Sequence, residues 1–320
     1  MKAAIYKKYG RADELKIEDV DKPVPNKNQV LIEMHASTVN RTDEGFRRAN
    51  YFVSRFFTGL NKPKREIWGS EFAGKIIEIG SDVTNFTVGE RVFGFDDLNG
   101  SAHAEYMVFD SNGSIAKIPK DMKYLDVSAA GEGATYALNY IEAAKIKKGQ
   151  NVLVYGASGA IGSAAVQILK HIGVNVTAVC GTINLKKIKD LGADKVIDYE
   201  KEYYTQIDET FDLIFDAVGK SSYGACKNLL KPGGMYCSSE LGFALQNPLL
   251  AIWFSITGSH RVIFPIPKIN KEKIDYIQDL LSDGAYKPLV DKVYDFEDIV
   301  TAAKYVETGQ KAGNVVIKMK

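Results

Sequence analysis

The chain has 320 residues, of which 45% are hydrophobic and 25% are charged, a composition typical of globular proteins that excludes disordered, collagen-like and disulfide-rich classes. Its 41 basic and 40 acidic side chains leave a net charge of +1, so the charge gives no reason to expect nucleic acid or an anionic membrane as a partner. The length exceeds what one compact core usually holds, and we therefore expect two domains.

The cysteines and the N-terminal segment indicate a compartment. Cys180, Cys226 and Cys237 are isolated, with neither CxxC nor metal-ligand spacing, which fits a reducing environment. The first residues carry charges every few positions and lack the apolar segment of a secretory signal. No stretch approaches the ~18 apolar residues that span a bilayer. We expect a soluble, cytoplasmic protein without a membrane partner.

The first third of the chain is expected to be rich in β-strands. Short strands are predicted over residues 29–37, 72–79 and 91–95. Glycines punctuate this region at a spacing that is typical of antiparallel barrels and sandwiches.

From Tyr124 onward the pattern predicts alternating helices and strands, which implies a parallel, doubly wound sheet. After Pro267 this alternation stops, and we expect the tail to return to the first domain. The predicted fold is therefore α/β, with one domain of residues 1–123 and 268–320 and a dinucleotide-binding Rossmann domain of residues 124–267. The predicted helices are 127–144, 160–172, 185–191, 223–230 (ended by Pro232-Gly233-Gly234), 271–282 and 296–308, and the predicted strands are 151–155, 174–180, 195–198, 211–217, 235–239 and 314–318.

A glycine-rich turn between a buried strand and an amphipathic helix is the strongest single signal. A first glycine permits the tight turn, a second lets the backbone approach a pyrophosphate, and a third allows close packing of helix and sheet. The alternative, a merely structural turn, is disfavoured by the surrounding βαβ pattern. We predict that the cofactor is bound here by Gly156, Ser158, Gly159, Ala160, Ile161 and Gly162.

The end of the second strand favours NADPH over NADH. NAD sites usually place a carboxylate there for the ribose 2′-hydroxyl, but residues 179–184 contain none. Thr182, Asn184 and Lys186 provide hydroxyl, amide and ammonium groups that can bind a 2′-phosphate. The alternative is that Lys186 and Lys187 simply lie on a solvated helix face.

With these features in view, nearly the whole chain resembles the zinc-lacking, quinone oxidoreductase-like branch of the medium-chain dehydrogenase/reductase superfamily. The resemblance implies a GroES-like catalytic domain beside the Rossmann domain, and NADPH as cofactor. It is carried by Met1-Lys2-Ala3, Ala36-Ser37-Thr38-Val39-Asn40-Arg41-Thr42-Asp43, Gly69-Ser70-Glu71-Phe72-Ala73-Gly74, Val88-Gly89-Glu90-Arg91-Val92-Phe93-Gly94, Leu191-Gly192-Ala193-Asp194, Asp212-Leu213-Ile214-Phe215-Asp216-Ala217-Val218-Gly219 and Gly313-Asn314-Val315-Val316-Ile317.

The same resemblance argues against a zinc site. Asn40 stands where the zinc-using members have a cysteine ligand, and Ser70 where they have a histidine. Neutral amide and hydroxyl groups are poor zinc donors, and the four-cysteine lobe of a structural zinc is absent from the sequence. We therefore assign no metal.

Without a Lewis acid, reduction of a conjugated carbonyl is easier to support than oxidation of an alcohol. The resemblance thus implies NADPH-dependent reduction of a quinone or an α,β-unsaturated carbonyl. Two alternatives stay open. One is a 2-enoyl-thioester reductase, for which the segment 41–66 argues because it carries seven cationic and three acidic side chains. The other is a non-catalytic NADPH-binding sensor or interaction protein.

Three residues are candidates for the catalytic pocket. Asn40 and Asp43 follow a predicted strand where the family has its pocket, and their alternative role is that of turn residues. Tyr51 is a candidate proton donor or stacking ring, although a packing role is also open. Arg47 is expected to pair with Asp43 or Glu71 rather than to act in chemistry.

The resemblance adds two cofactor contacts. Thr135 lies where relatives have a threonine beside the nicotinamide, although Glu132 departs from the family pattern there. Asn314 lies where relatives often have a polar or basic side chain near the cofactor. The apolar segments 248–254 and 262–264 end the predicted dinucleotide domain, and because the last strand pairs across a two-fold axis in relatives, we expect a homodimer.

Overall fold

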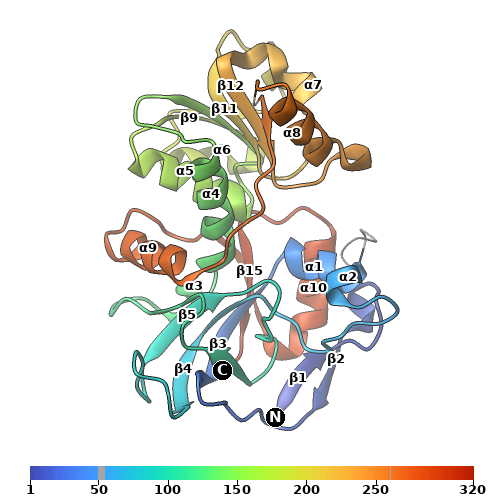
Figure 1. Ribbon diagram of the computed structural model, residues 1–320, viewed down its shortest axis with the longest axis vertical. Coiled ribbons are helices and arrows are strands. Elements are labelled where there is room, and N and C mark those ends of the chain that lie inside the picture. The colour runs from blue at the N-terminus through green and yellow to red at the C-terminus, as the bar shows by residue number, and fades with distance from the viewer. Residues whose placement is uncertain (50–54, 260) are drawn as a thin grey trace. The chain divides into compact units, whose positions relative to one another are not determined.

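The computed structural model describes residues 1–49, 55–259 and 261–320 (Figure 1). The chain divides into two compact units. The first unit is Met1–Glu132, Ile269–Ser282 and Pro288–Lys320, and the second is Gly133–Lys268 and Asp283–Lys287. The domain limits at residues 123 and 267 stay a prediction about the folding domains.

A mostly antiparallel sheet, in which β14 and β15 form a parallel pair, dominates the first unit. Its strands follow the order β14-β15-β3-β4-β5-β7, and β6 pairs with the first half of β3. A separate hairpin-like pair is formed by β1 and β2. The bounds are β1 Lys2–Ile5, β2 Lys16–Asp19, β3 Gln29–Val39, β4 Glu71–Ile79, β5 Arg91–Phe95, β6 Tyr106–Asp110, β7 Ile115–Lys117, β14 Val290–Asp295 and β15 Asn314–Lys318.

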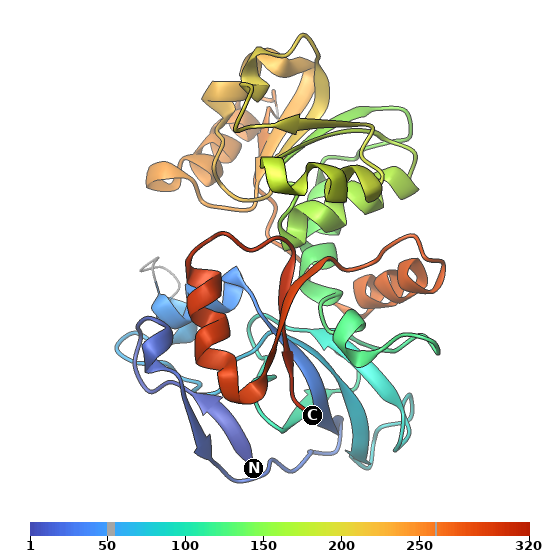
Figure 2. The same cartoon turned by 180° about the vertical axis from the view of Figure 1, so that it is seen from behind.

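The C-terminal strand of the chain completes the sheet of the first unit. β15 runs antiparallel to β3, with Val315 opposite Val39 and Ile317 opposite Ser37 (Figure 2). This pairing brings the start of β15 to the end of β3, where the candidate residues Asn40 and Asn314 lie. The helices of this unit are α1 Arg41–Arg48, α2 Arg55–Thr58, α3 Tyr124–Val127, α9 Lys271–Ser282 and α10 Ile299–Glu307.

A six-stranded parallel sheet forms the second unit, in the order β10-β9-β8-β11-β12-β13. Numbered along the chain this is 3-2-1-4-5-6, the order of a Rossmann sheet. Residues 152–154 of its central strand have no solvent exposure, as expected for a parallel sheet covered on both faces. The predicted α/β fold with a doubly wound sheet and a β-rich part is confirmed. The strands are β8 Asn151–Tyr155, β9 Asn175–Cys180, β10 Lys195–Asp198, β11 Phe211–Asp216, β12 Leu230–Ser238 and β13 Val262–Ile263. The helices are α4 Gly131–Ala143, whose first two residues belong to the first unit, α5 Ala160–His171, α6 Leu185–Asp190, α7 Tyr223–Cys226 and α8 Gln246–Ile256.

Three predicted helices are wrong in extent. The helix predicted over 127–144 is two helices, α3 and α4, and at the start of α4 a Cβ on Gly131 would lie 2.5 Å from Phe95 Cβ, so this backbone packs against β5. The helix predicted over 223–230 ends at Cys226. Pro232-Gly233-Gly234 lie inside β12, at a register shift against β11, instead of ending a helix. The helix predicted over 296–308 begins with a 3-10 turn before α10.

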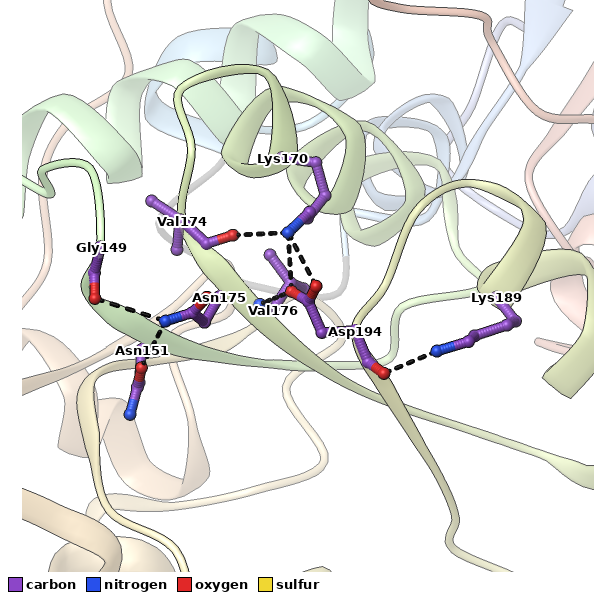
Figure 3. A network of polar contacts seen from close by, with 8 residues as sticks. All are labelled: Gly149, Asn151, Lys170, Val174, Asn175, Val176, Lys189 and Asp194. Atoms are coloured by element: carbon purple, nitrogen blue, oxygen red, sulfur yellow. Dashed lines mark hydrogen bonds and ion pairs between the residues drawn. The ribbon is translucent and has the colours of Figure 1, made fainter.

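A polar network ties the elements after the central strand together (Figure 3). The ammonium of Lys170, near the end of α5, donates to Val174 O at 2.9 Å and to both carboxylate oxygens of Asp194 at 2.9 and 2.7 Å. Asp194 also accepts from Val176 N–H at 2.7 Å, and Lys189 Nζ donates to Asp194 O at 2.6 Å. Burial alone would raise the pKa of Asp194, but the hydrogen bonds from Lys170 and Val176 outweigh it and lower that pKa. The network fixes β9 and the approach to β10.

Candidate active site and cofactor turn

Two of the three predicted glycines are required by the fold of the turn itself. Gly156 directly follows β8 and has φ +77°, and a Cβ there would lie 2.5 Å from a methyl group of Val218. A Cβ on Gly162 would lie 2.3 Å from Gly156 O. These positions accept only glycine without rearrangement, because one needs the left-handed backbone region and the other has backbone in the way.

Gly159 differs from both, because the protein itself has room for a side chain there. Its φ is −76°, and the nearest atoms to an added Cβ are Gly156 O at 3.4 Å and a Val218 methyl at 3.8 Å. It is the N-cap of α5, a helix of 12 residues. An open position before a helix N-terminus fits the approach of a pyrophosphate, which a Cβ would obstruct. The residues present therefore fit a dinucleotide, with Ser158 and Ile161 half-buried beside Gly159.

Sequence analysis missed two carboxylates beside Thr182. The Thr182 hydroxyl donates to Asp198 Oδ2 at 2.6 Å and lies 3.1 Å from Glu200 Oε2. Asp198 ends β10 and pairs in register with Cys180 at the end of β9. The signal that could have found it is the register of parallel strands, whose carboxyl ends meet at one edge.

The other two residues predicted to favour NADPH lie on and before α6. Asn184 is half-buried and is the N-cap of α6. Lys186 is 88% exposed, and its ammonium pairs with Asp190 at 2.7 Å. An exposed ion pair of this kind is typical of a solvated helix face.

A buried polar group in the first unit gathers residues from five parts of the chain. We call it the carboxylate cluster. Its acidic members are Asp43, Glu71 and Glu132, all less than 8% exposed. They come from α1, β4 and α4, and the amides of Asn40 and Asn314 lie among them at the ends of β3 and β15. The cluster consists of Thr38, Asn40, Thr42, Asp43, Ser70, Glu71, Glu132, Lys311 and Asn314.

Glu71 accepts more hydrogen bonds than Glu132, the other glutamate of the cluster. Its Oε2 accepts from Thr38 Oγ1 at 2.7 Å and from Asn40 Nδ2 at 2.9 Å. Its Oε1 accepts from the backbone N–H of Glu132 at 2.7 Å. Burial raises the pKa of Glu71 to about 7, although the N–H of Glu132 and the hydroxyl of Thr38 oppose the rise. Three donors make Glu71 the better site for a negative charge.

Glu132 has fewer donors than Glu71. Its Oε1 accepts from Thr42 Oγ1 at 2.6 Å, whereas its Oε2 is buried with no partner among the described residues. Burial, Glu71 and Asp43 together raise the pKa of Glu132 to about 8. Glu132 is therefore the protonated member of the pair near neutral pH.

The structure brings together Asn40 and Asp43, predicted for the catalytic pocket, and Asn314, predicted as a cofactor contact. Asp43 Oδ2 accepts from Asn40 N–H at 2.8 Å, so both residues also form the turn that begins α1. Asn40 Nδ2 donates to Asn314 Oδ1 at 3.1 Å. Tyr51 lies outside the described residues. Thr135 lies in the second unit, and its hydroxyl is buried without a described partner.

The predicted partner of Arg47 is wrong. Its guanidinium pairs with Glu307 in α10 at 2.8 Å rather than with Asp43 or Glu71. Both side chains are more than four-fifths buried, and the pair joins α1 to α10. No local signal links residues 260 positions apart in the sequence.

The donor set around Asn40 does not fit a zinc ion. Asn40 Oδ1 accepts a hydrogen bond from the Lys311 ammonium at 3.0 Å, and Ser70 Oγ donates to Asp43 Oδ1 at 3.3 Å. Within residues 1–49, 55–259 and 261–320, no group of three or more His, Cys, Asp or Glu side chains is arranged to hold a metal ion. An amide that already faces a cation is a poor ligand for a second one.

A pocket of about 400 Å³ lies elsewhere in the first unit. Its wall includes the cations Lys64 and Arg65 and the ring of Trp68, whose indole N–H is buried without a described partner. Arg65 also donates to Asn99, whose carbonyl oxygen lies 2.8 Å away. The remaining lining residues are Phe56, Thr58 and Leu98.

Comparison with known proteins gives matches along almost the whole chain. Residues 26–120 match the alcohol dehydrogenase GroES-like domain, and residues 191–317 match the family described as zinc-binding dehydrogenase. A 2-methylene-furan-3-one reductase of Solanum lycopersicum is 30% identical, covering 99% of this chain and 79% of the relative. The chain belongs to the medium-chain dehydrogenase/reductase superfamily.

Two further matches support its quinone oxidoreductase-like branch, so the chain is an oxidoreductase. An NADPH-dependent alkenal/one oxidoreductase of Arabidopsis thaliana is 28% identical, covering 99% of this chain and 79% of the relative. The structure of a quinone oxidoreductase from Coxiella burnetii superposes with a TM-score of 0.89 at 26% identity, covering 100% of this chain and 99% of that one. The predicted family and the GroES-like part of the fold are confirmed. The segment matched as zinc-binding dehydrogenase does not include positions 40 and 70, so the family description says nothing about metal ligands at those two positions.

The protonation of Glu132 should make stability depend on pH. Its pKa rises from 4.5 in the unfolded chain to about 8 on folding, so proton uptake stabilises the fold below pH 4.5, and this contribution is lost as the pH rises through 8. Glu132→Gln keeps the shape without the titration. We expect Tm of wild type to fall relative to Glu132→Gln between about pH 5 and 9, by several degrees, or roughly 1–3 kcal/mol.

The exposed variant Glu297→Gln is the control and should follow the wild-type curve. Parallel Tm profiles of wild type and Glu132→Gln would contradict the protonation assigned to Glu132.

Proposed function

We propose that this oxidoreductase reduces a quinone or an α,β-unsaturated carbonyl with NADPH, without a metal ion. The observation that carries the proposal is the hydrogen bond from Lys311 to Asn40 Oδ1, because an amide oxygen that already accepts from an ammonium is a poor metal ligand. When bound, a reduced nicotinamide supplies a hydride. A conjugated carbonyl accepts hydride at its β-carbon, and hydrogen bonds then suffice to stabilise the oxygen.

The choice of NADPH rests on a balance of charges near Thr182. Asp198 and Glu200 repel a 2′-phosphate, whereas the exposed ammonium groups of Lys186, Lys187 and Lys201 attract it. Lys201 Nζ lies 3.4 Å from Asp198 Oδ2 and partly neutralises that carboxylate. The Arabidopsis relative named for NADPH supports the same choice.

The decisive measurement is consumption of NADPH and of NADH by the purified protein with quinones, enones and enals. We expect turnover with at least one class, and kcat/KM about tenfold or more higher with NADPH, a difference of roughly 1.4 kcal/mol. The absence of turnover with the whole panel would overturn the function. A preference for NADH would overturn the cofactor, and stoichiometric zinc in metal analysis would overturn the metal-free site.

A single methyl group tests the cofactor turn. Because a Cβ fits at position 159 of the protein alone, Gly159→Ala should fold with an almost unchanged Tm and still bind NADPH about tenfold or more weakly. Gly162→Ala should lower Tm, because its Cβ meets Gly156 O. Gly45→Ala, at a site inside α1 with no atom within 4 Å of the added Cβ, is the control: it should bind NADPH as wild type does, and its Tm should not fall because alanine favours a helix.

Isothermal titration with NADPH and thermal melts report these two effects separately. Equal NADPH affinity of wild type and Gly159→Ala would refute binding at this turn.

A second candidate substrate class is a 2-enoyl thioester of coenzyme A or a carrier protein. The pocket that carries Lys64, Arg65 and Trp68 favours it, since cations and an unpaired N–H suit a phosphate-bearing substrate. Crotonyl-coenzyme A and a simple enone should then differ in KM, and Lys64→Ala or Arg65→Ala should raise KM for the thioester alone. Equal effects on both substrates would exclude this class.

We also propose a homodimer in the cytoplasm. The exposed apolar side chains of α8 support the dimer, as does β13 at the edge of its sheet.

Among the described helices, none is both long and apolar enough to span a membrane. The three cysteines are free and buried, which suits a reducing compartment. Light scattering that gives a monomer at micromolar concentration, or cell fractionation that places the protein elsewhere, would end these two proposals. The α8 side chains are Leu249, Ile252, Trp253 and Ile256.

A further inference from the structure

Lys311 provides the only ammonium group among the named residues of the carboxylate cluster. It lies between α10 and β15, and its ammonium donates to Asn40 Oδ1 at 3.0 Å and to Gly313 O at 2.6 Å. Both acceptors are neutral, and Lys311 forms no ion pair with a described carboxylate. An ammonium has three N–H donors, so two are used and one is left. The residue is half-buried.

The cluster fixes the orientation of the amide that holds Lys311. Asn40 Nδ2 donates to Glu71 Oε2 at 2.9 Å and to Asn314 Oδ1 at 3.1 Å. Two acceptors on the nitrogen side assign the amide oxygen to the lysine side. Asn314 is itself held, because its Nδ2 donates to Leu289 O at 3.1 Å. Lys311 is thus anchored by an amide that cannot turn without breaking two buried bonds.

The charged groups around Lys311 come from four elements. Glu132 of α4, Glu71 of β4 and Asp291 of β14 favour its charged form, whereas Arg41 of α1 opposes it. Burial lowers the pKa of Lys311 against these three carboxyl groups. A lysine in such surroundings combines a cation with a proton that it can share, which arginine cannot do.

The poor fit of zinc at Asn40 follows from the charges of the groups involved. A cysteine ligand would bring a negative thiolate to a divalent cation, whereas Asn40 brings a neutral oxygen to a monovalent ammonium. The site therefore offers an ammonium to a substrate oxygen rather than a set of metal ligands. Preorganised donors of this kind stabilise negative charge that develops on a substrate oxygen.

We propose that Lys311 is a catalytic residue, whose remaining N–H donates to the carbonyl oxygen of the substrate. This inference rests on the proposed reduction of a conjugated carbonyl. As a hydride bonds to the β-carbon, the C=C electron pair shifts to form the α-carbon–carbonyl double bond, and the carbonyl π pair moves onto oxygen. The enolate oxygen is stabilised by Lys311, and a proton from water then bonds to the α-carbon. The substrate gains two electrons and two hydrogens, and the dinucleotide is oxidised.

Binding of 4-nitrophenolate tests the donor without turnover, because its phenolate oxygen imitates the enolate. Its dissociation constant is measured by absorbance with wild type, Lys311→Met and Lys311→Gln. We expect both variants to bind it roughly 10-fold to 100-fold more weakly. Lys304→Met removes an exposed lysine of α10 that pairs with Asp13, and should bind as wild type does. Lys311→Gln keeps a donor for Asn40 and serves if the methionine variant fails to fold.

Kinetics separates a catalytic from a structural role. Lys311→Met should lower kcat by roughly 10²–10³ with little change in KM for NADPH, and Lys311→Arg should restore part of the loss. Phenolate binding that is absent in wild type or unchanged in both neutral variants overturns the proposal, as does an unchanged kcat. If wild type binds phenolate through Lys311 but reduces no quinone, enone or enal, the proposed function fails and the donor role of Lys311 stands.

Discussion

The burial of Glu71 is the constraint on which the first unit depends. A carboxylate without exposure is tolerated only if donors replace its hydration, and here they come from the hydroxyl of Thr38, the amide of Asn40 and the backbone of Glu132. These donors belong to the end of β3, the residue that follows it, and the first turn of α4. The ends of β3, β4, β15 and α4 must all meet around the side chain of Glu71. The hydrogen bonds of its carboxylate therefore fix the positions of these ends in the sheet. The amide at position 40 is needed for this purpose whether or not a ligand is present.

The same network explains the proton content of the cluster. Three buried carboxyl groups and one ammonium lie in the same cluster, so their charges cannot all be present at once without large cost. Glu71 has three donors and Glu132 has one, and the proton therefore resides on Glu132. This asymmetry is a matter of hydrogen-bond counting rather than of distance to solvent. Burial lowers the pKa of the Lys311 ammonium, and the neighbouring carboxyl groups oppose this effect.

Most of the architecture could be predicted from the sequence, and the reasons are local. The strands 91–95, 151–155 and 314–318 and the helix 271–282 have the predicted limits, because apolar periodicity and turn residues mark their ends. The break between α3 and α4 was missed, because the start of α4 depends on contact with Phe95, far away in the chain. Of the cluster, Asn40, Asp43 and Asn314 were found through the family pattern. Glu132 was seen as a departure from that pattern, but its partner Thr42 and its neighbour Lys311 could not be found without the tertiary structure.

The neighbourhood of Thr182 shows why cofactor preference resists prediction from one strand end. The residues after β9 contain no carboxylate, yet Asp198 lies within hydrogen-bonding distance because β10 runs parallel to β9 in matching register. The charge that a 2′-phosphate would meet is the sum over two strand ends and a helix face. Around it stand the carboxylate of Asp198, which accepts from the Thr182 hydroxyl, the carboxylate of Glu200, and three ammonium groups on exposed side chains. Exposed lysines can turn toward a phosphate, although fixing each side chain costs up to about 2 kcal/mol of rotamer entropy, whereas the carboxylate of Asp198 is 6% exposed and held by its hydroxyl partner. Preference for NADPH therefore depends on whether the threonine hydroxyl continues to satisfy Asp198 while the lysines rearrange.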